Sequence, residues 1–258
     1  MSLTKTKTEI EKMRAGGALL SRALTAAIQI AHAGVKVCDL NSVAENEIIK
    51  GGGTPSFKGY RSSKAYPPFP STLCVSINEE IVHGLGNRKI ELKQGDIVGL
   101  DIGCWYQGLC TDMAATVFVD NASDNAKQLL RVTREALIEA IESVKIGGKI
   151  SDIGEAVEKH VKPYGYGIVR SLTGHGVGHE VHEEPHIPNF ITKQFPEIEI
   201  VEGMCLAIEP MIALGDYLVE TADDGWAAVM KDKSIGAHFE VTIAVTEAGV
   251  EILTPLPV

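Results

Sequence analysis

The sequence predicts an α+β protein in which helices cover a largely antiparallel sheet. Pairs of predicted helices are followed by strand-like runs, and this order begins twice along the 258 residues. No linker rich in proline, serine and glycine separates the two halves, which span about 8–120 and 123–256. We therefore expect a single domain over residues 1–258, with two halves related by a pseudo-two-fold axis around one core.

The first half opens with two predicted helices. Thr8 and Glu11 have the spacing of a capping box, and apolar residues at roughly helical intervals extend the first helix to about residue 33. Asp39 is the expected N-cap of a second helix, Leu40 to about Lys50, which three glycines terminate. A loop rich in proline, serine and aromatic residues follows. The strand-like segments after it are Thr72–Ile77, Asp96–Cys104 and Leu109–Val119.

The second half repeats this order. Asp124 should cap a helix that ends near Val144, and Ser151 or Asp152 should cap another that ends near Pro163, before further strands and turns. A shift of 113 residues matches Gly34 with Gly147, Lys36 with Lys149, Asp39 with Asp152, and Glu45 with Glu158. We interpret this match as an internal repeat.

Composition and charge exclude several classes of protein. The chain is 45% hydrophobic and 22% charged, as globular proteins are, and its net charge of −10 disfavours a nucleic-acid partner. Five cysteines without a C-x-x-C pair favour a reducing compartment. The N-terminal segment lacks the apolar stretch of a signal peptide, and no apolar run is long enough to span a membrane. We expect a cytoplasmic monomer without membrane attachment.

Two aspartates in neighbouring strands are the first candidates for chemistry. A turn near Tyr106–Gly108 would place Asp101 opposite Asp112, give or take one residue, with Cβ atoms about 4.5–5.5 Å apart. Two carboxylates this close repel each other, so they must share a proton or a cation. The alternative is one exposed aspartate at a sheet edge and one in a turn.

Histidines and single glutamates supply the remaining candidates. Residues 173–190 hold four of the eight histidines, and Glu209 and Glu240 each lie in an apolar strand-like run where an unpaired carboxylate is costly. His182–His186 matches H-E-x-x-H, the helical zinc-peptidase signature, but Pro185 disfavours the helix that this signature requires. We therefore interpret that match as accidental.

Together these residues predict a site for two metal ions. Four carboxylates and one imidazole, His175, suit Mn, Fe, Co or Zn, and two divalent cations balance the four negative charges. Paired metals lower the pKa of water from 15.7 towards about 7. The expected chemistry is metal-assisted hydrolysis.

Five ordered motifs resemble the type I methionine aminopeptidases from about Thr8 to Pro255: SINEEIVHG, LDIGCWYQGLCTD, TGHGVGHEVHEEPHIPN, AIEPM and DDGWAAVMKDKSIGAHFEVTIAVT. The resemblance implies the pita-bread fold, a curved antiparallel sheet with two pseudo-symmetric halves. It also implies a metallo-exopeptidase that removes the initiator methionine from nascent polypeptides with a small second residue. A metal-bridging hydroxide would attack the first peptide bond.

Carried over position by position, the resemblance places the five metal ligands on Asp101, Asp112, His175, Glu209 and Glu240. Asp112 and Glu240 would bridge the two ions, and Glu209 would also shuttle a proton. His83 would contact the substrate near the scissile bond, while His182 would bind the scissile carbonyl oxygen.

The resemblance also implies a pocket for the methionine side chain. Cys74 and Trp226 fall on pocket positions of the family. The loop that supplies the family's aromatic pocket residues here contains Phe57, Tyr60, Tyr66 and Phe69. For any one of these aromatics, anchoring of the loop is an equal alternative to substrate contact. The segment Arg61–Pro67 looks inserted relative to the family.

Two other functions share this fold. One is a proline-specific or creatinase-type enzyme, and the other is a binding module that has lost its metals. The motifs around Trp226, HEEP and IEPM favour the methionine branch, and the five occupied ligand positions favour an enzyme. Its partners would be the N-termini of nascent chains, with transient ribosome contact through the surface of the catalytic domain.

Overall fold

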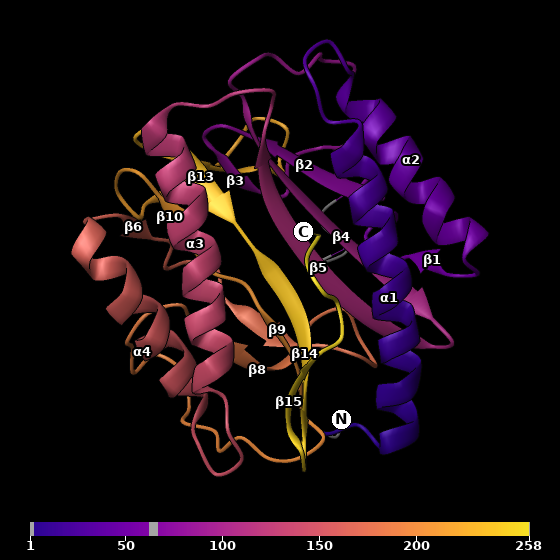
Figure 1. Ribbon diagram of the computed structural model, residues 1–258, viewed down its shortest axis with the longest axis vertical. Helices are drawn as coiled ribbons and strands as arrows, with labels where there is room; N and C mark the ends of the chain where they lie inside the picture. Colours follow the sequence, from indigo (N-terminus) through magenta and orange to yellow (C-terminus); the bar gives the residue numbers. More distant parts are fainter. Residues whose placement is uncertain (1–2, 62–66, 258) are drawn as a thin grey trace.

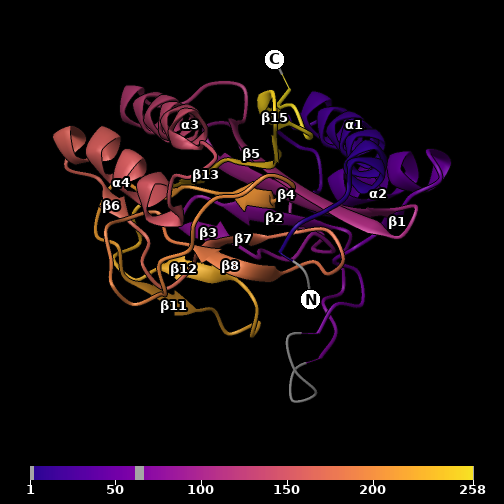
Figure 2. The ribbon, with the colours of Figure 1, turned by 90° about the horizontal axis from the view of Figure 1, so that it is seen from below.

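The computed structural model describes residues 3–61 and 67–257. All four of the helices labelled in Figure 1 lie on one face of a large sheet. The view from below shows these helices above the sheet, with β3 (Glu80–Val82), β11 (Val219–Thr221) and β12 (Ala228–Met230) beneath it (Figure 2). The helices therefore cover one face of the large sheet, and β3, β11 and β12 lie on the side of the other face.

The helices form two pairs, one in each half of the chain. They are α1 (Lys7–Gln29), α2 (Val37–Lys50), α3 (Asp124–Ser143) and α4 (Ile150–Val161), followed by the 3-10 helix Lys162–Tyr164. α2 and α4 begin 113 residues apart, which is the shift found in the sequence. Within the described ranges, no helix is both long enough and apolar enough to cross a membrane.

Strands from both halves build the large sheet, which has nine strands among the described residues. Its main order is β1–β4–β5–β14–β9–β7–β8, with β2 added on β4 and β15 on β14, and its pairings are antiparallel. The strands are β1 (Thr54–Pro55), β2 (Leu73–Ile77), β4 (Ile97–Tyr106), β5 (Leu109–Phe118), β7 (Gly174–Gly176), β8 (Glu183–Ile187), β9 (Cys205–Ile208), β14 (Glu240–Thr246) and β15 (Gly249–Ile252). The predicted α+β class with an antiparallel sheet is confirmed.

Two small sheets lie beside the large one. The first pairs β6 (Gly167–Ile168), β10 (Met211–Ala213) and β13 (Gly236–His238), and the second pairs β3, β11 and β12. β13 ends one residue before β14 begins, so the chain passes directly from a small sheet into the large one.

The first helix begins two residues earlier than the sequence predicted. Its capping box uses Thr6 and Glu9 rather than Thr8 and Glu11: Thr6 Oγ1 accepts from the Glu9 amide, and Glu9 accepts from the Thr6 amide at 2.7 Å. The Thr6 amide is the main reason that the pKa of Glu9 falls to about 2. Glu9 also lies 2.8 Å from Nε2 of His179. Thr6 and Thr8 each have a glutamate three residues later, so either could form a capping box. The contact between Glu9 and His179, which is distant along the chain, favours the start at Thr6.

The predicted N-caps Asp39 and Asp152 lie inside their helices, as third residues. The actual N-caps of α2 and α4 are Lys36 and Lys149, whose own side chains accept no capping bond. At α4, Oδ2 of Asp152 accepts from the Lys149 amide at 2.9 Å, and the first amide of the helix donates to the carbonyl of Ile198 at 3.0 Å. The sequence could not reveal this partner, which is distant along the chain.

Alternation along the strands separates the two faces of the sheet. In β4, Leu100, Ile102 and Cys104 are fully buried in the main hydrophobic core with residues of the helices. Asp101, which alternates with them, instead lines a pocket. The helical face thus supplies the core and leaves the opposite face free for polar groups.

The helix α1 packs closely on the C-terminal segment at Gly17. A Cβ atom built at this glycine would lie 2.1 Å from the carbonyl oxygen of Leu253. Glycine inside a helix is unfavourable by about 1 kcal/mol relative to alanine, so close packing explains its presence here.

We predict that Gly17→Ala destabilises the protein by about 1–3 kcal/mol, because the overpacking of α1 outweighs the gain in helix propensity. Thermal denaturation would measure the loss. The control is Ala18→Gly, an exposed position on the same helix, which should cost only the propensity difference of about 1 kcal/mol. A Gly17→Ala variant as stable as the parent would contradict the close packing.

Candidate metal centre

The predicted ligands share the sheet face that points away from the helices. Asp101 pairs with Ala114, and Ala114 pairs with Glu240, so two carboxylates flank one small residue across three strands. Asp112 lies two residues before Ala114 on β5 and therefore has the same orientation. On another pair of strands of this sheet, His175 of β7 pairs with Ala207 of β9. The small side chains of Ala114 and Ala207 leave space above this face of the sheet.

The two aspartates are not directly opposite each other, so that prediction was wrong by two residues. The hairpin turn is centred on Gln107 and Gly108, both with positive φ, and it sets Asp112 opposite Gly103. A two-residue turn with two left-handed positions is typical of hairpins. Because the shift is an even number, both side chains keep the same face. Their diagonal relation leaves more room between the carboxylates than direct pairing would.

One cavity of about 450 Å³ is lined by all five predicted metal ligands, both predicted catalytic histidines and three predicted pocket residues. The predicted residues that line it are Phe69, Cys74, His83, Asp101, Asp112, His175, His182, Glu209, Trp226 and Glu240. The cavity is also lined by Phe57, Tyr60, Thr221 and Gly225.

The carboxyl groups are buried and raise one another's pKa values. Loss of solvation is the largest cause for all four, and it raises the pKa of Asp101 to about 7. The pKa values of Asp112, Glu209 and Glu240 are raised as well, first by burial and then by the neighbouring carboxylates. Without cations, protons would have to neutralise this cluster near neutral pH.

Several buried polar atoms lack a hydrogen-bond partner in the described part of the chain. Among them are Oδ1 of Asp101, Oδ1 of Asp112, Oε1 of Glu240 and Nε2 of His238. Two groups of three residues each bring one donor atom per residue within 4.8 Å of the others: Asp101, His238 and Glu240, and Asp112, His175 and Glu240. Oxygen donors with one imidazole per group fit divalent transition metals.

The ring of His175 is oriented by its own backbone surroundings. Its Nδ1 donates to the carbonyl of Gly176 at 2.8 Å, which leaves Nε2 free, 3.5 Å from Oε1 of Glu209. Burial lowers the pKa of His175 to about 3, so the imidazole is neutral. A neutral, oriented imidazole is the form that binds a metal ion.

His182 approaches the same cavity from the residue before β8. Its Nδ1 lies 2.9 Å from the Tyr60 hydroxyl, and its ring meets that of His175 edge-on with centroids 4.5 Å apart. His186 lies within β8 and is exposed, so residues 182–186 are not helical. The rejection of the H-E-x-x-H match is confirmed.

His83 follows β3 at another wall of the cavity. Its φ angle of 62° is in the left-handed region, which is uncommon for a residue other than glycine. Such backbone strain persists only where the surroundings hold it, and it clusters at functional sites.

An aromatic pair forms the apolar side of the cavity. The rings of Phe69 and Trp226 meet edge-on with centroids 5.1 Å apart. The Phe69 amide donates to the carbonyl of Tyr60 at 2.8 Å, and this bond closes the loop that carries Tyr60 and Phe69. Tyr66 and residues 62–65 of the segment that looked inserted lie outside the described residues.

The comparisons with known proteins identify the family of the chain. The pattern described as metallopeptidase family M24 matches residues 11–247. The chain belongs to metallopeptidase family M24. It is accordingly an aminopeptidase that uses divalent metal, as the sequence motifs predicted.

Relatives within this M24 family cover the chain almost completely. Methionine aminopeptidase from Clostridium acetobutylicum is 39% identical over 254 residues, with 98% of this chain and 99% of the relative covered. The crystal structure of methionine aminopeptidase from Thermotoga maritima has a TM-score of 0.92 at 41% identity, covering 97% of this chain and 98% of its own. Prolidase from Pyrococcus furiosus, at 24% identity, shares the fold alone, with a TM-score of 0.79 and 99% and 66% coverage. The predicted resemblance and the pita-bread fold are confirmed.

His238 also lies close to the predicted ligands, and the sequence assigned it no ligand role. It lies two positions before Glu240, and a period of two would have placed both side chains on the same face. The change from β13 to β14 between them interrupts that period, yet donor atoms of His238, Glu240 and Asp101 all lie within 4.8 Å of one another. Burial lowers the pKa of His238 to about 3.

A buried ion pair ties the N-terminal segment to the histidine-bearing segment. Nζ of Lys5 lies 2.5 Å from Oε2 of Glu183, and both side chains are almost fully buried. Oε1 of Glu183 accepts from the amides of His179 and Glu180. A Cβ atom at Gly178 would lie 2.4 Å from Cε of Lys5, so this glycine provides the channel for the lysine. The pair fixes the turn that leads to His182.

We predict that Lys5→Met destabilises the protein by about 3–5 kcal/mol, because it leaves the Glu183 carboxylate buried without its countercharge. Urea denaturation would measure the change in unfolding free energy. The double variant Lys5→Met/Glu183→Gln should lose less than the sum of the single variants. Strict additivity would show that the two side chains do not interact.

We also predict that Mn²⁺ or Co²⁺ raises the melting temperature more at pH 8 than at pH 6. The metal-free site holds protons more tightly than the unfolded chain, so stability is lost as pH rises from about 4 through the folded-state pKa. For Asp101 this folded-state pKa is about 7. Differential scanning calorimetry, with EDTA as the reference, would measure the gain. An equal or larger gain at pH 6 would contradict the raised pKa values.

Proposed function

We propose that this enzyme removes the N-terminal methionine from nascent polypeptides whose second residue is small. The observation that carries the proposal is the single cavity in which four buried carboxylates and an imidazole adjoin an aromatic wall. The methionine aminopeptidases of Clostridium acetobutylicum and Thermotoga maritima support it through their nearly full-length similarity.

The proposed metal ligands are Asp101, Asp112, His175, Glu209 and Glu240, for two ions of Co, Mn, Fe or Zn. Glu240 belongs to both groups of converging donor atoms, which supports its role as a bridge, and Asp112 is the proposed second bridge. Bound cations would supply Lewis acidity and lower the pKa of water at the reacting bond.

His182 is proposed to bind the scissile carbonyl oxygen. When the Tyr60 hydroxyl donates to Nδ1, the imidazole proton resides on Nε2, which can then donate to that oxygen as charge develops on it. The surrounding protein lowers the pKa of His182, which favours this neutral form. His83 is proposed to contact the substrate on the side of the scissile amide nitrogen.

Glu209 is proposed to move the proton. It would accept a proton from the attacking water and deliver it to the leaving amine. The position of its carboxyl in the cavity, with Oε1 3.5 Å from Nε2 of His175, supports this role. Asn189, which is fully buried, donates to the carbonyl of Glu209 at 2.9 Å and fixes its backbone.

Phe69, Cys74 and Trp226 are the proposed contacts of the methionine side chain. A thioether packs favourably against aromatic rings, and the edge-on pair of Phe69 and Trp226 offers such a surface. Cys74 pairs with Asp101 in the sheet, so this pocket adjoins the ligands directly. Five free cysteines support action in the reducing cytoplasm, where nascent chains occur.

The test is release of methionine from Met-Ala-Ser in the presence of Mn²⁺, Co²⁺ or Fe²⁺. We expect turnover that EDTA abolishes, and little turnover of Xaa-Pro peptides. Preferred cleavage of Xaa-Pro would instead indicate the proline-specific alternative, and metal-free, inactive protein would indicate a binding module.

We predict that Asp112→Asn lowers kcat/KM for this tripeptide by at least about 100-fold without unfolding the chain, because a neutral amide is a poor bridge between cations. The matched control is Asp120→Asn, since Asp120 lies just after β5 and outside the cavity. Activity of Asp112→Asn close to that of the parent would contradict the bridging role.

A further inference from the structure

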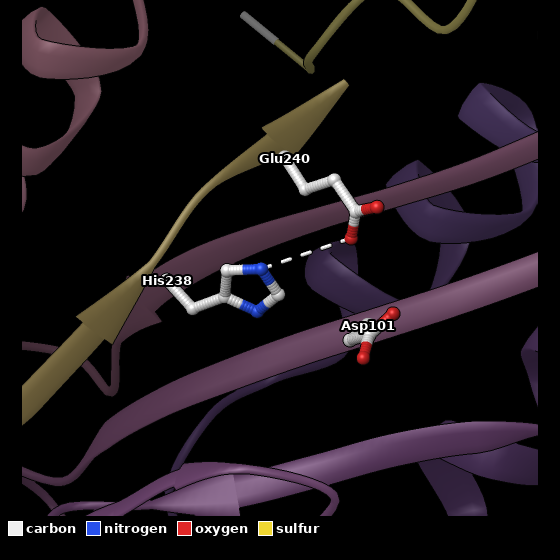
Figure 3. Close-up of side chains that lie close together, drawn as sticks. All are labelled: Asp101, His238 and Glu240. Atoms are coloured by element: carbon white, nitrogen blue, oxygen red, sulfur yellow. Dashed lines mark ion pairs between the residues drawn. The ribbon is translucent and has the colours of Figure 1, made fainter. Parts of the chain in front are cut away.

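His238 is a buried imidazole beside Glu209 and Glu240, two of the carboxylates that line the cavity. The residue is 3% exposed, and Nε2 has no hydrogen-bond partner among the described residues. Figure 3 shows His238 and Glu240 projecting from the chain of β13 and β14 towards Asp101 on the opposite side. A buried imidazole nitrogen without a partner is unfavourable unless a ligand completes it.

The distances around Nε2 are too long for hydrogen bonds and short enough for a shared cation. Nε2 lies 3.7 Å from Oε2 of Glu240 and 3.6 Å from Oε2 of Glu209. Hydrogen bonds between nitrogen and oxygen lie near 2.9 Å, whereas metal–ligand bonds of about 2.0–2.2 Å allow ligand atoms to be this far apart.

The position of the ring is fixed by its backbone. The His238 amide donates to Oγ1 of Thr116 at 2.9 Å, and Oγ1 of Thr116 donates to the His238 carbonyl at 2.7 Å. β13 also pairs His238 with Met211 of β10. These bonds hold the backbone of the residue against two neighbouring segments, and this fixes the point from which the ring projects.

We propose that Nε2 of His238 is a sixth protein ligand, bound to the metal ion that Asp101 and Glu240 hold. This inference deepens the proposed function and depends on its two-metal site. The two groups of converging donors then correspond, because each contains one aspartate, one histidine and the shared Glu240. His238 would serve the ion that Asp101 binds and His175 would serve the other, with Asp112 and Glu240 between the two ions.

The added imidazole has a consequence for the choice of metal. Oxygen-only surroundings suit Mn²⁺, whereas imidazole suits Fe²⁺, Co²⁺ and Zn²⁺. With a histidine at both ions, neither site is an oxygen-only site. His238→Gln, which replaces the nitrogen donor by an amide, should therefore shift the relative affinity of the Asp101 site towards Mn²⁺.

X-ray absorption spectroscopy of the wild-type protein loaded with two Zn²⁺ gives the decisive measurement. The number of imidazole ligands obtained from the spectrum, averaged over both ions, should be one per zinc. His238→Gln should reduce this number to about one half per zinc, while the exposed-site control His32→Gln should leave it unchanged. Wild-type protein with one half imidazole per zinc would overturn the proposal, whether or not any variant folds.

Isothermal titration with Zn²⁺ supplies a second readout. We expect two binding events in the wild type, and His238→Ala should weaken one of them by at least about 10-fold, with the melting temperature of the metal-free variant measured in parallel. Two unchanged events would overturn the role of His238 and leave the peptidase assignment intact. Wild-type protein that binds no metal would overturn the proposed two-metal function as well.

Discussion

Four carboxylates on one face of the sheet repel one another inside a cavity that excludes much of the solvent. Two unit charges about 5 Å apart interact by about 3 kcal/mol at an effective dielectric constant of about 20, and the four groups form several such pairs. The raised pKa values of Asp112, Glu209 and Glu240 express this repulsion together with the cost of burial, and burial alone raises that of Asp101. Bound cations would offset both effects, so the proposed metal binding accounts for the residue pattern of this face.

The sheet supports this cluster because its other face contributes most of the hydrophobic core. Helices from both halves cover that face, and the pairs α1/α2 and α3/α4 lie on either side in Figure 1. Strands from both halves then meet at the site, with β4 and β5 from the first and β9 and β14 from the second. Rigid neighbouring strands hold the ligands in place, which a metal site requires.

The sequence predicted features that depend on local periodicity and missed those that depend on distant partners. The common face of Asp101 and Asp112 follows from the period of two, but the exact register depended on a turn whose type the sequence did not reveal. Either Thr6 or Thr8 could have capped α1, and contacts of Glu9 decided between them. The sequence assigned no ligand role to His238, because a strand ends between it and Glu240 and hides the shared orientation.

The sheet and the loops contribute differently to the proposed activity. The proposed metal ligands come from paired strands or from the residue adjoining one. Phe69 and Trp226 instead lie in loops closed by a few hydrogen bonds, such as that from the Trp226 amide to Asp224. Loop changes can therefore alter the range of substrates while the metal site persists. Tyr60 differs from the other loop residues, because its hydroxyl contacts His182 across the cavity. If His182 binds the scissile carbonyl oxygen as proposed, a loop change that displaces Tyr60 would lower kcat as well as raise KM.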